Sequence, residues 1–202
     1  MEQETLFTSS KWDILRCLES GKKSPIDLAK ETNTSVANIS QQLRLLELAG
    51  FVKSERVSNR DKGLPRILYS ISDNHSYIVA SMPGFVNKKF LKLHDHQKCT
   101  LKIWFLDNVN LQRYIERFFW AHLEQNLDKI DAIALDAKDF GHIKVSIVSS
   151  SLDAKKFKDI VISGNNGPVK FSVNFVKDSD AKKLLSNHYV LHDPKNLISG
   201  AY

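Results

Sequence analysis

The hydrophobic period of this sequence changes at Gly50, from the spacing of a helix to the alternation of strands. Before Gly50, apolar residues recur every three or four positions, which predicts a helix with one buried stripe made of Val36, Ile39, Leu43 and Leu46. After Gly50, residues 51–57 and 66–71 read as two strands around a polar loop at 58–65, which predicts a β-hairpin. The first part of the chain therefore combines helices with a hairpin.

Two shorter helices are expected before the one that ends at Gly50. Ser10 and Asp13 have the spacing of a capping box, which predicts the start of the first helix. Ser24 followed by Pro25 predicts the start of the second, because serine caps helices and proline loses nothing at the first helical position. Helix, short helix, helix and basic hairpin is the element order of a winged helix-turn-helix.

Five spaced segments of this region resemble the ArsR-type winged-helix transcriptional regulators, over residues 5–73 in all. The segments are Asp13–Leu15, Asp27–Lys30, Val36–Leu43, Leu46–Val52 and Tyr69–Ile71. The resemblance implies that a recognition helix at residues 35–49 enters the major groove of double-stranded DNA and that the basic wing at residues 53–66 lies on its backbone. It also implies a homodimer on a pseudo-palindromic site, with half-sites about one helical turn apart.

The candidate DNA-binding residues belong to the recognition helix and the wing. Asparagine and glutamine amides bond adenine edges, arginine bonds guanine or phosphate, and small side chains permit a close approach of the helix. On the helix the candidates are Ser35, Ala37, Asn38, Gln41, Gln42 and Arg44; on the wing they are Arg56, Asn59, Arg60, Lys62 and Arg66. The open alternative is that these polar residues are an ordinary solvated surface.

The distribution of charge favours a polyanionic partner. The chain has 29 basic and 23 acidic residues, a formal net charge of +6. Between Lys53 and Arg66 five basic residues stand against Glu55 and Asp61, so half of the excess lies in the wing. Such a cluster next to a polar helix is typical of proteins that bind nucleic acid.

The second half predicts a small α/β domain, with a helix at 108–127 and strands at 130–135, 143–148 and 169–176. Its element order resembles a minimal nucleotidyltransferase domain, in which an Asp-x-Asp pair and a third carboxylate hold magnesium ions. The corresponding positions here carry either His142 and Lys144 or Lys144 and Ser146, with Ser172 and Asn174 on the later strand. The resemblance is therefore to a degenerate domain, and we expect neither catalysis nor a bound metal or cofactor.

Residues 75–100 lose regular periodicity and contain Pro83 and Gly84, which favours a linker. This divides the chain into a winged-helix DNA-binding domain at 1–74, a linker at 75–100, and an α/β domain at 101–202 for dimerisation or effector sensing. His94, His96 and Cys99 could be read as zinc ligands. Their spacing matches no strong zinc signature, so we expect a polar linker there.

The sequence thus predicts an α+β chain that acts as a sequence-specific DNA-binding transcriptional regulator and not as an enzyme. Two cysteines, no long apolar run and no signal-like start favour a cytoplasmic protein without a membrane partner. A homodimer and a small-molecule effector of unknown identity are the expected partners. Two alternatives stay open: a nucleotidyltransferase-type enzyme targeted to nucleic acid, and a non-enzymatic interaction module.

Arg60→Ala should weaken binding to all DNA sequences alike, because a phosphate contact carries no base information. The slope of log affinity against log salt should fall by about one unit, which a salt titration of the gel-shift affinity measures. An unchanged slope would remove Arg60 from the backbone contacts.

Overall fold

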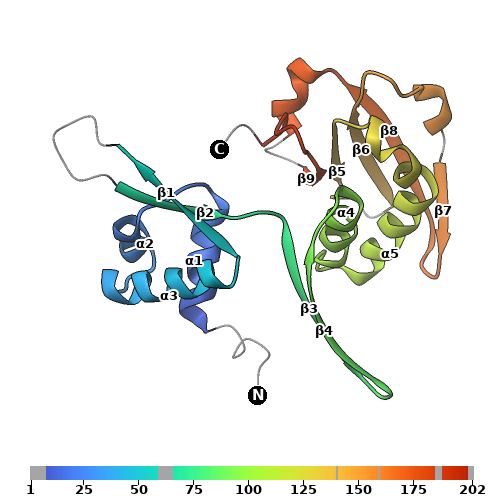
Figure 1. Cartoon of the computed structure of the whole chain (residues 1–202). Coiled ribbons are helices and arrows are strands. Elements are labelled where there is room, and N and C mark those ends of the chain that lie inside the picture. The colour runs from blue at the N-terminus through green and yellow to red at the C-terminus, as the bar shows by residue number, and fades with distance from the viewer. Residues whose placement is uncertain (1–7, 59–65, 140, 159, 185–187, 200–202) are drawn as a thin grey trace. The chain divides into compact units, whose positions relative to one another are not determined.

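The computed structural model describes residues 8–58, 66–139, 141–158, 160–184 and 188–199, which belong to two compact units, 1–92 and 93–201 (Figure 1). Both units combine helices and strands, so the predicted α+β class is confirmed. Among the described residues, no helix is both long enough and apolar enough to span a bilayer.

The first unit begins with a three-helix body and a two-stranded wing. Its helices are α1 (Ser9–Glu19), α2 (Pro25–Glu31) and α3 (Val36–Leu48), and its wing strands are β1 (Val52–Val57) and β2 (Arg66–Ile71), which pair antiparallel. The core that joins them consists of Ile14, Leu18, Leu28, Ala29, Ile39, Leu43, Leu46 and Val52. The predicted order of a winged helix-turn-helix is thereby confirmed.

Two details of the helix predictions are wrong. Val36 does not join the buried stripe of α3: it is 43% exposed, because it is the first residue of the helix and the core begins one turn later, at Ile39. Ser10 does not cap α1, because the helix already begins at Ser9 with Thr8 at the N-cap position. In contrast, Ser24 caps α2 as predicted, with Asp27 completing a capping box.

Residues 75–92 form a second hairpin where the sequence predicts a linker. β3 (His75–Met82) and β4 (Phe85–Lys92) pair antiparallel along their whole length, and α4 starts soon afterwards, at Asp95. Pro83 and Gly84 are the two turn residues of this hairpin; Gly84 has φ +80°, the conformation that glycine supplies in a type II turn. The prediction fails because both strand faces carry apolar residues, so no simple polar–apolar alternation is visible.

The second unit is a five-stranded mixed sheet with helices against it. Its helical segments are α4 (Asp95–Trp104), α5 (Val109–Phe118), η2 (Phe119–Leu123), η3 (Glu124–Lys129), η4 (Ala154–Phe157) and η5 (Asp178–Leu184). Its strands are β5 (Ala132–Asp136), β6 (His142–Val148), β7 (Ile160–Gly164), β8 (Gly167–Val176) and β9 (Tyr189–His192). The sheet order is β7-β8-β6-β5-β9, and only the β6–β8 pair is parallel.

The two faces of this sheet bury different side chains. α4, α5 and η2 pack on one face, where the ring of Phe118 stacks on that of Phe171 at 4.3 Å between centroids. On the other face the small residues Ala132 and Ala134 of β5 lie against η5. The single helix predicted at 108–127 is three helical segments joined end to end: α5, the π-helical η2 and the 3₁₀-helical η3.

Gly164→Ala should destabilise the second unit. A Cβ atom at this position would lie 2.5 Å from the ring of Tyr114, whose hydroxyl donates a hydrogen bond to the carbonyl of Gly167 at 2.7 Å. Moving the ring to make room would stretch that bond, so we expect a loss of about 1–3 kcal/mol in the free energy of unfolding. Urea denaturation measures it.

Gly141→Ala is the matched control for this substitution. Its added Cβ atom would meet only Asp139 Oδ1, at an ordinary contact distance of 3.5 Å. We expect its unfolding midpoint to stay close to that of the unmodified chain. Equal midpoints for the two variants would show that the contact between Gly164 and Tyr114 does not constrain the unit.

Candidate nucleic-acid interface

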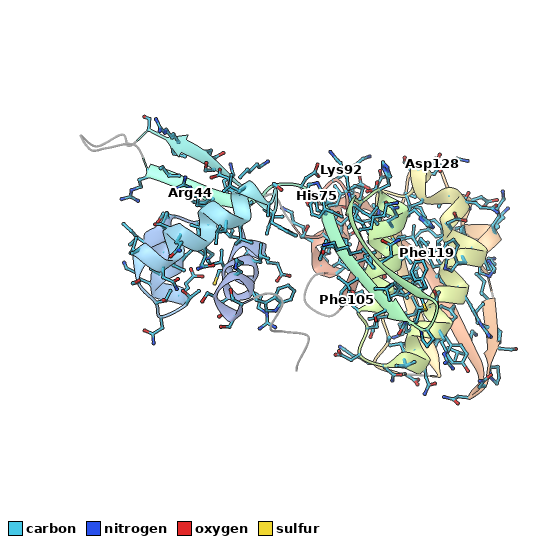
Figure 2. The ribbon with its side chains drawn as sticks, turned by 60° about the horizontal axis from the view of Figure 1, so that its bottom comes forward. Arg44, His75, Lys92, Phe105, Phe119 and Asp128 are labelled. Atoms are coloured by element: carbon cyan, nitrogen blue, oxygen red, sulfur yellow. The ribbon has the colours of Figure 1, made fainter. Side chains whose placement is uncertain are left out.

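The exposed face of α3 is centred on Gln41. Successive residues of a helix advance by about 100° around its axis, so the face opposite the buried Ile39 and Leu43 carries Ala37, Gln41 and Arg44. All three side chains are exposed, and Arg44 projects from α3 in Figure 2. This face therefore presents a small side chain, an amide and a guanidinium together.

Three of the candidate residues on α3 are engaged within the helix itself. Ser35 is the N-cap residue, and its Oγ accepts a hydrogen bond from the Asn38 backbone N–H at 3.2 Å. Asn38 Nδ2 donates to Thr34 Oγ1 at 3.2 Å, and Gln42 Nε2 donates to Asn38 Oδ1 at 3.4 Å. Asn38 and Gln42 are also half-buried, so Gln41 and Arg44 are the more accessible polar groups.

Sequence reasoning missed two exposed residues at the start of α3. Val36 was assigned to the core stripe, yet it faces solvent beside Ser40, whose Oγ donates to the Val36 carbonyl at 2.8 Å. An exposed valine on a recognition helix is a suitable contact for the methyl group of thymine. The signal that could have identified it is its position in the first helical turn, where core contacts often end.

The wing carries its described basic residues on both faces. Because side chains alternate along a strand, the register of β1 with β2 places Lys53 and Arg66 on one face and Arg56 on the other. All three are exposed, and within the described chain none of them takes part in an ion pair. The candidates Asn59, Arg60 and Lys62 lie outside the described residues.

Two side-chain contacts fix the wing relative to α3. Glu47, in the last turn of α3, accepts hydrogen bonds from Ser54 Oγ at 2.7 Å and from the Ser54 N–H at 3.1 Å. Ser72 Oγ donates to the carbonyl of Gly50, which has φ +79° and ends the helix as predicted. Hydrogen bonds therefore hold the start of β1 and the end of β2 beside the C-terminal end of α3.

Acidic charge on the wing is partly offset by a lysine that precedes α2. Glu55 Oε1 lies 2.7 Å from Lys22 Nζ, and both side chains are nearly half exposed. Asp27, in α2, keeps its negative charge: the hydroxyl and backbone N–H of Ser24 bond its carboxylate and hold its pKa below the ordinary value. Glu55 is thus the one acidic residue of the described wing strands, and it is paired, while Lys53, Arg56 and Arg66 form no ion pair with a described residue.

His94, His96 and Cys99 do not converge on one point. His94 is exposed at the start of α4, while His96 Nε2 lies 3.8 Å from Glu124. Cys99 is fully buried, and burial raises the pKa of its thiol to about 12, which keeps it from becoming the thiolate that metals bind. Among the described residues, no three His, Cys, Asp or Glu side chains are grouped as a metal site would need.

In the second unit, the residues at the expected carboxylate positions share one face of the sheet. The parallel register of β6 and β8 sets Lys144 opposite Ser172, and Ser146 opposite Asn174. Asp136, at the end of β5, lies opposite Lys144. The one carboxylate among these five residues, that of Asp136, therefore lies beside the cationic side chain of Lys144.

Comparison with known proteins gives a match to a family model, matches to solved structures and one negative result. A solved structure of a double mutant of ZitR from Lactococcus lactis is 25% identical over 32% of this chain, with a TM-score of 0.29; the match spans 42% of that chain. A search of curated proteins finds no match. Residues 8–54, which include α1, α2, α3 and the start of β1, carry a helix-turn-helix that matches the model of the arsR family of bacterial regulatory proteins.

Proposed function

We propose that this chain is a sequence-specific DNA-binding transcriptional regulator. α3 enters the major groove and the wing follows the phosphate backbone. The observation that carries the proposal is the exposed face of α3, with Ala37, Gln41 and Arg44, hydrogen-bonded to a wing whose described basic side chains form no ion pair within the described residues. The match of residues 8–54 to the arsR family model supports the same function.

The chemistry of this surface divides into two roles. Gln41 is the best placed group to read a base, because its amide is exposed and can bond an adenine edge with both donor and acceptor. Arg44 reaches guanine or phosphate from the next turn, and Ala37 leaves room for the groove wall. Lys53, Arg56 and Arg66 neutralise phosphates, which gives affinity and register without sequence information.

A dimer completes this function. A single recognition helix covers only one half-site, whereas two copies related by a two-fold axis read two half-sites about 34 Å apart. We propose that the second unit contributes to assembly or to sensing an effector. We also propose a cytoplasmic location, because both cysteines are free thiols.

We also propose that the second unit is not catalytic. The support is chemical: Lys144, Ser146, Ser172 and Asn174 are paired across β6 and β8, at the positions where the resemblance to a nucleotidyltransferase implies carboxylates. Lysine repels a divalent cation, while the hydroxyl and amide groups supply no negative charge to bind it.

Isothermal calorimetry of the full chain with ATP and magnesium should show no metal-dependent heat. Control titrations without magnesium identify any weak phosphate binding to surface lysines, which needs no metal. Saturable binding of ATP that requires magnesium would contradict the proposal and favour the enzyme alternative.

Gln41→Ala should relax sequence preference and cost about 1–3 kcal/mol of binding free energy at the preferred site. The preferred site comes first from selection of duplexes bound by the full chain in a random pool. Affinities for that site and for its single-base variants are then measured at a fixed salt concentration. The loss should be confined to the base pair that Gln41 contacts.

Two further variants make this result specific. Gln125→Ala removes an exposed glutamine from the second unit and should change nothing. Arg56→Ala should weaken all duplexes alike, since it removes a phosphate contact. If the selection enriches no sequence, or if Gln41→Ala and Gln125→Ala bind identically, α3 is not the reading element.

A further inference from the structure

The hairpin of β3 and β4 is too small to be stable as an isolated sheet. Within the described chain it has two strands only, and neither outer edge pairs with another strand. An isolated two-stranded hairpin in water is marginal, and three or more strands with an apolar face are usually required. Figure 1 shows it as a two-stranded ribbon that follows β2.

Only the base of this hairpin is anchored to its own unit. The ring of His75 stacks on Phe90 at 4.8 Å, and Phe90 meets Phe51 edge-on at 5.4 Å. Lys92, the register partner of His75, forms an ion pair with Asp73 at 2.5 Å; His75 and Lys92, at the base of the hairpin, are labelled in Figure 2. Toward the turn, the apolar residues are exposed: Val79 by 55%, Met82 by 56%, Phe85 by 49% and Val86 by 79%.

The two edges of the hairpin differ in charge. β4 carries Lys88, Lys89 and Lys92, whereas β3, from His75 to Met82, has no lysine, arginine or acidic residue. Lysines on an edge strand are a common protection against pairing with another chain. β3 also lacks proline and is rich in residues that favour strands, so its edge is unprotected. Two β3 edges can pair without charge repulsion, while two β4 edges cannot.

Hairpin geometry identifies which backbone groups are free on β3. The pair that flanks a two-residue turn, here Met82 and Phe85, exchanges hydrogen bonds, and such pairs alternate along the ladder. Residues 76, 78, 80 and 82 therefore direct their N–H and C=O groups toward β4. Residues 75, 77, 79 and 81 direct theirs outward, as a row of donors and acceptors that fits an antiparallel strand.

We propose that β3 is the dimerisation edge and that its occupant is the β3 strand of a second copy of this chain. Antiparallel pairing of β3 with itself has two-fold symmetry, so the same residues serve both copies. It converts two marginal hairpins into one four-stranded sheet and brings the exposed apolar residues of both copies together on its faces. The inference rests on the dimer of the proposed function and names the surface that forms it.

A pair of proline variants tests the edge directly. Val79 and Lys88 are register partners, and both direct their N–H groups away from the hairpin. Proline at an edge position removes an outward donor and spares the internal ladder. Val79→Pro should raise the dimer dissociation constant by about 100-fold, because the lost donor occurs twice in a symmetric pair. Lys88→Pro, the matched control, should leave the constant unchanged; light scattering over a concentration series measures both.

Amide exchange of the unmodified chain gives an independent measurement that needs no variant. The amides of residues 77, 79 and 81 should gain protection as the protein concentration rises through the dimer dissociation constant, while those of 78, 80 and 82 stay protected throughout. Protection of the first set that does not change with concentration would overturn the proposal. So would a strict monomer, or a Val79→Pro variant that dimerises as the unmodified chain does.

These outcomes are separable from the fate of the DNA-binding proposal. Oligomeric state and amide exchange are measured without DNA. A monomeric Val79→Pro variant should still bind an isolated half-site, because α3 and the wing are unaltered. If neither the unmodified chain nor any variant binds a duplex, the proposed function fails. The dimer measurements would still show whether β3 pairs with the β3 strand of a second copy.

Discussion

The burial of one stripe of α3 against α1 and α2 determines the rest of the first unit. Ile39, Leu43 and Leu46 are inaccessible in the core, so the rotation of the helix about its axis is settled. That rotation alone decides that Gln41 faces outward and that Asn38 and Gln42 fall on the flank. Which polar side chains α3 exposes is therefore a consequence of which leucine and isoleucine residues are buried.

Polar contacts at the end of α3 hold the strands of the wing against this helix. Glu47 bonds Ser54, and Ser72 bonds the carbonyl of Gly50, so the hairpin cannot pivot freely on the helix. A reading helix and a phosphate-binding wing must keep a fixed separation to engage groove and backbone together. The same unit continues directly into β3 and β4, and we place the dimer contact there. Recognition and assembly would then share one continuous chain segment.

The second unit combines a well-packed core with a sheet face on which lysine, serine and asparagine side chains are paired. Phe118 and Phe171 stack in the core, and Tyr114 fills the space above Gly164. The strand positions that could have carried metal ligands hold lysine, serine and asparagine instead. This chemistry is the basis of our proposal that the second unit is not catalytic.

Sequence by itself determined the elements whose signals are local. The change of period at Gly50, the Ser24–Asp27 cap and the alternating wing strands each depend on residues within a few positions of one another, so the winged helix could be predicted closely. Tertiary structure decided what depends on distant partners. Val36 is exposed because the core shared with α1 and α2 begins one turn later, at Ile39, and Asn38 and Gln42 are half-buried beside that core. The hairpin at 75–92 escaped prediction because both of its faces are apolar, and only pairing in space shows that Pro83 and Gly84 form a turn.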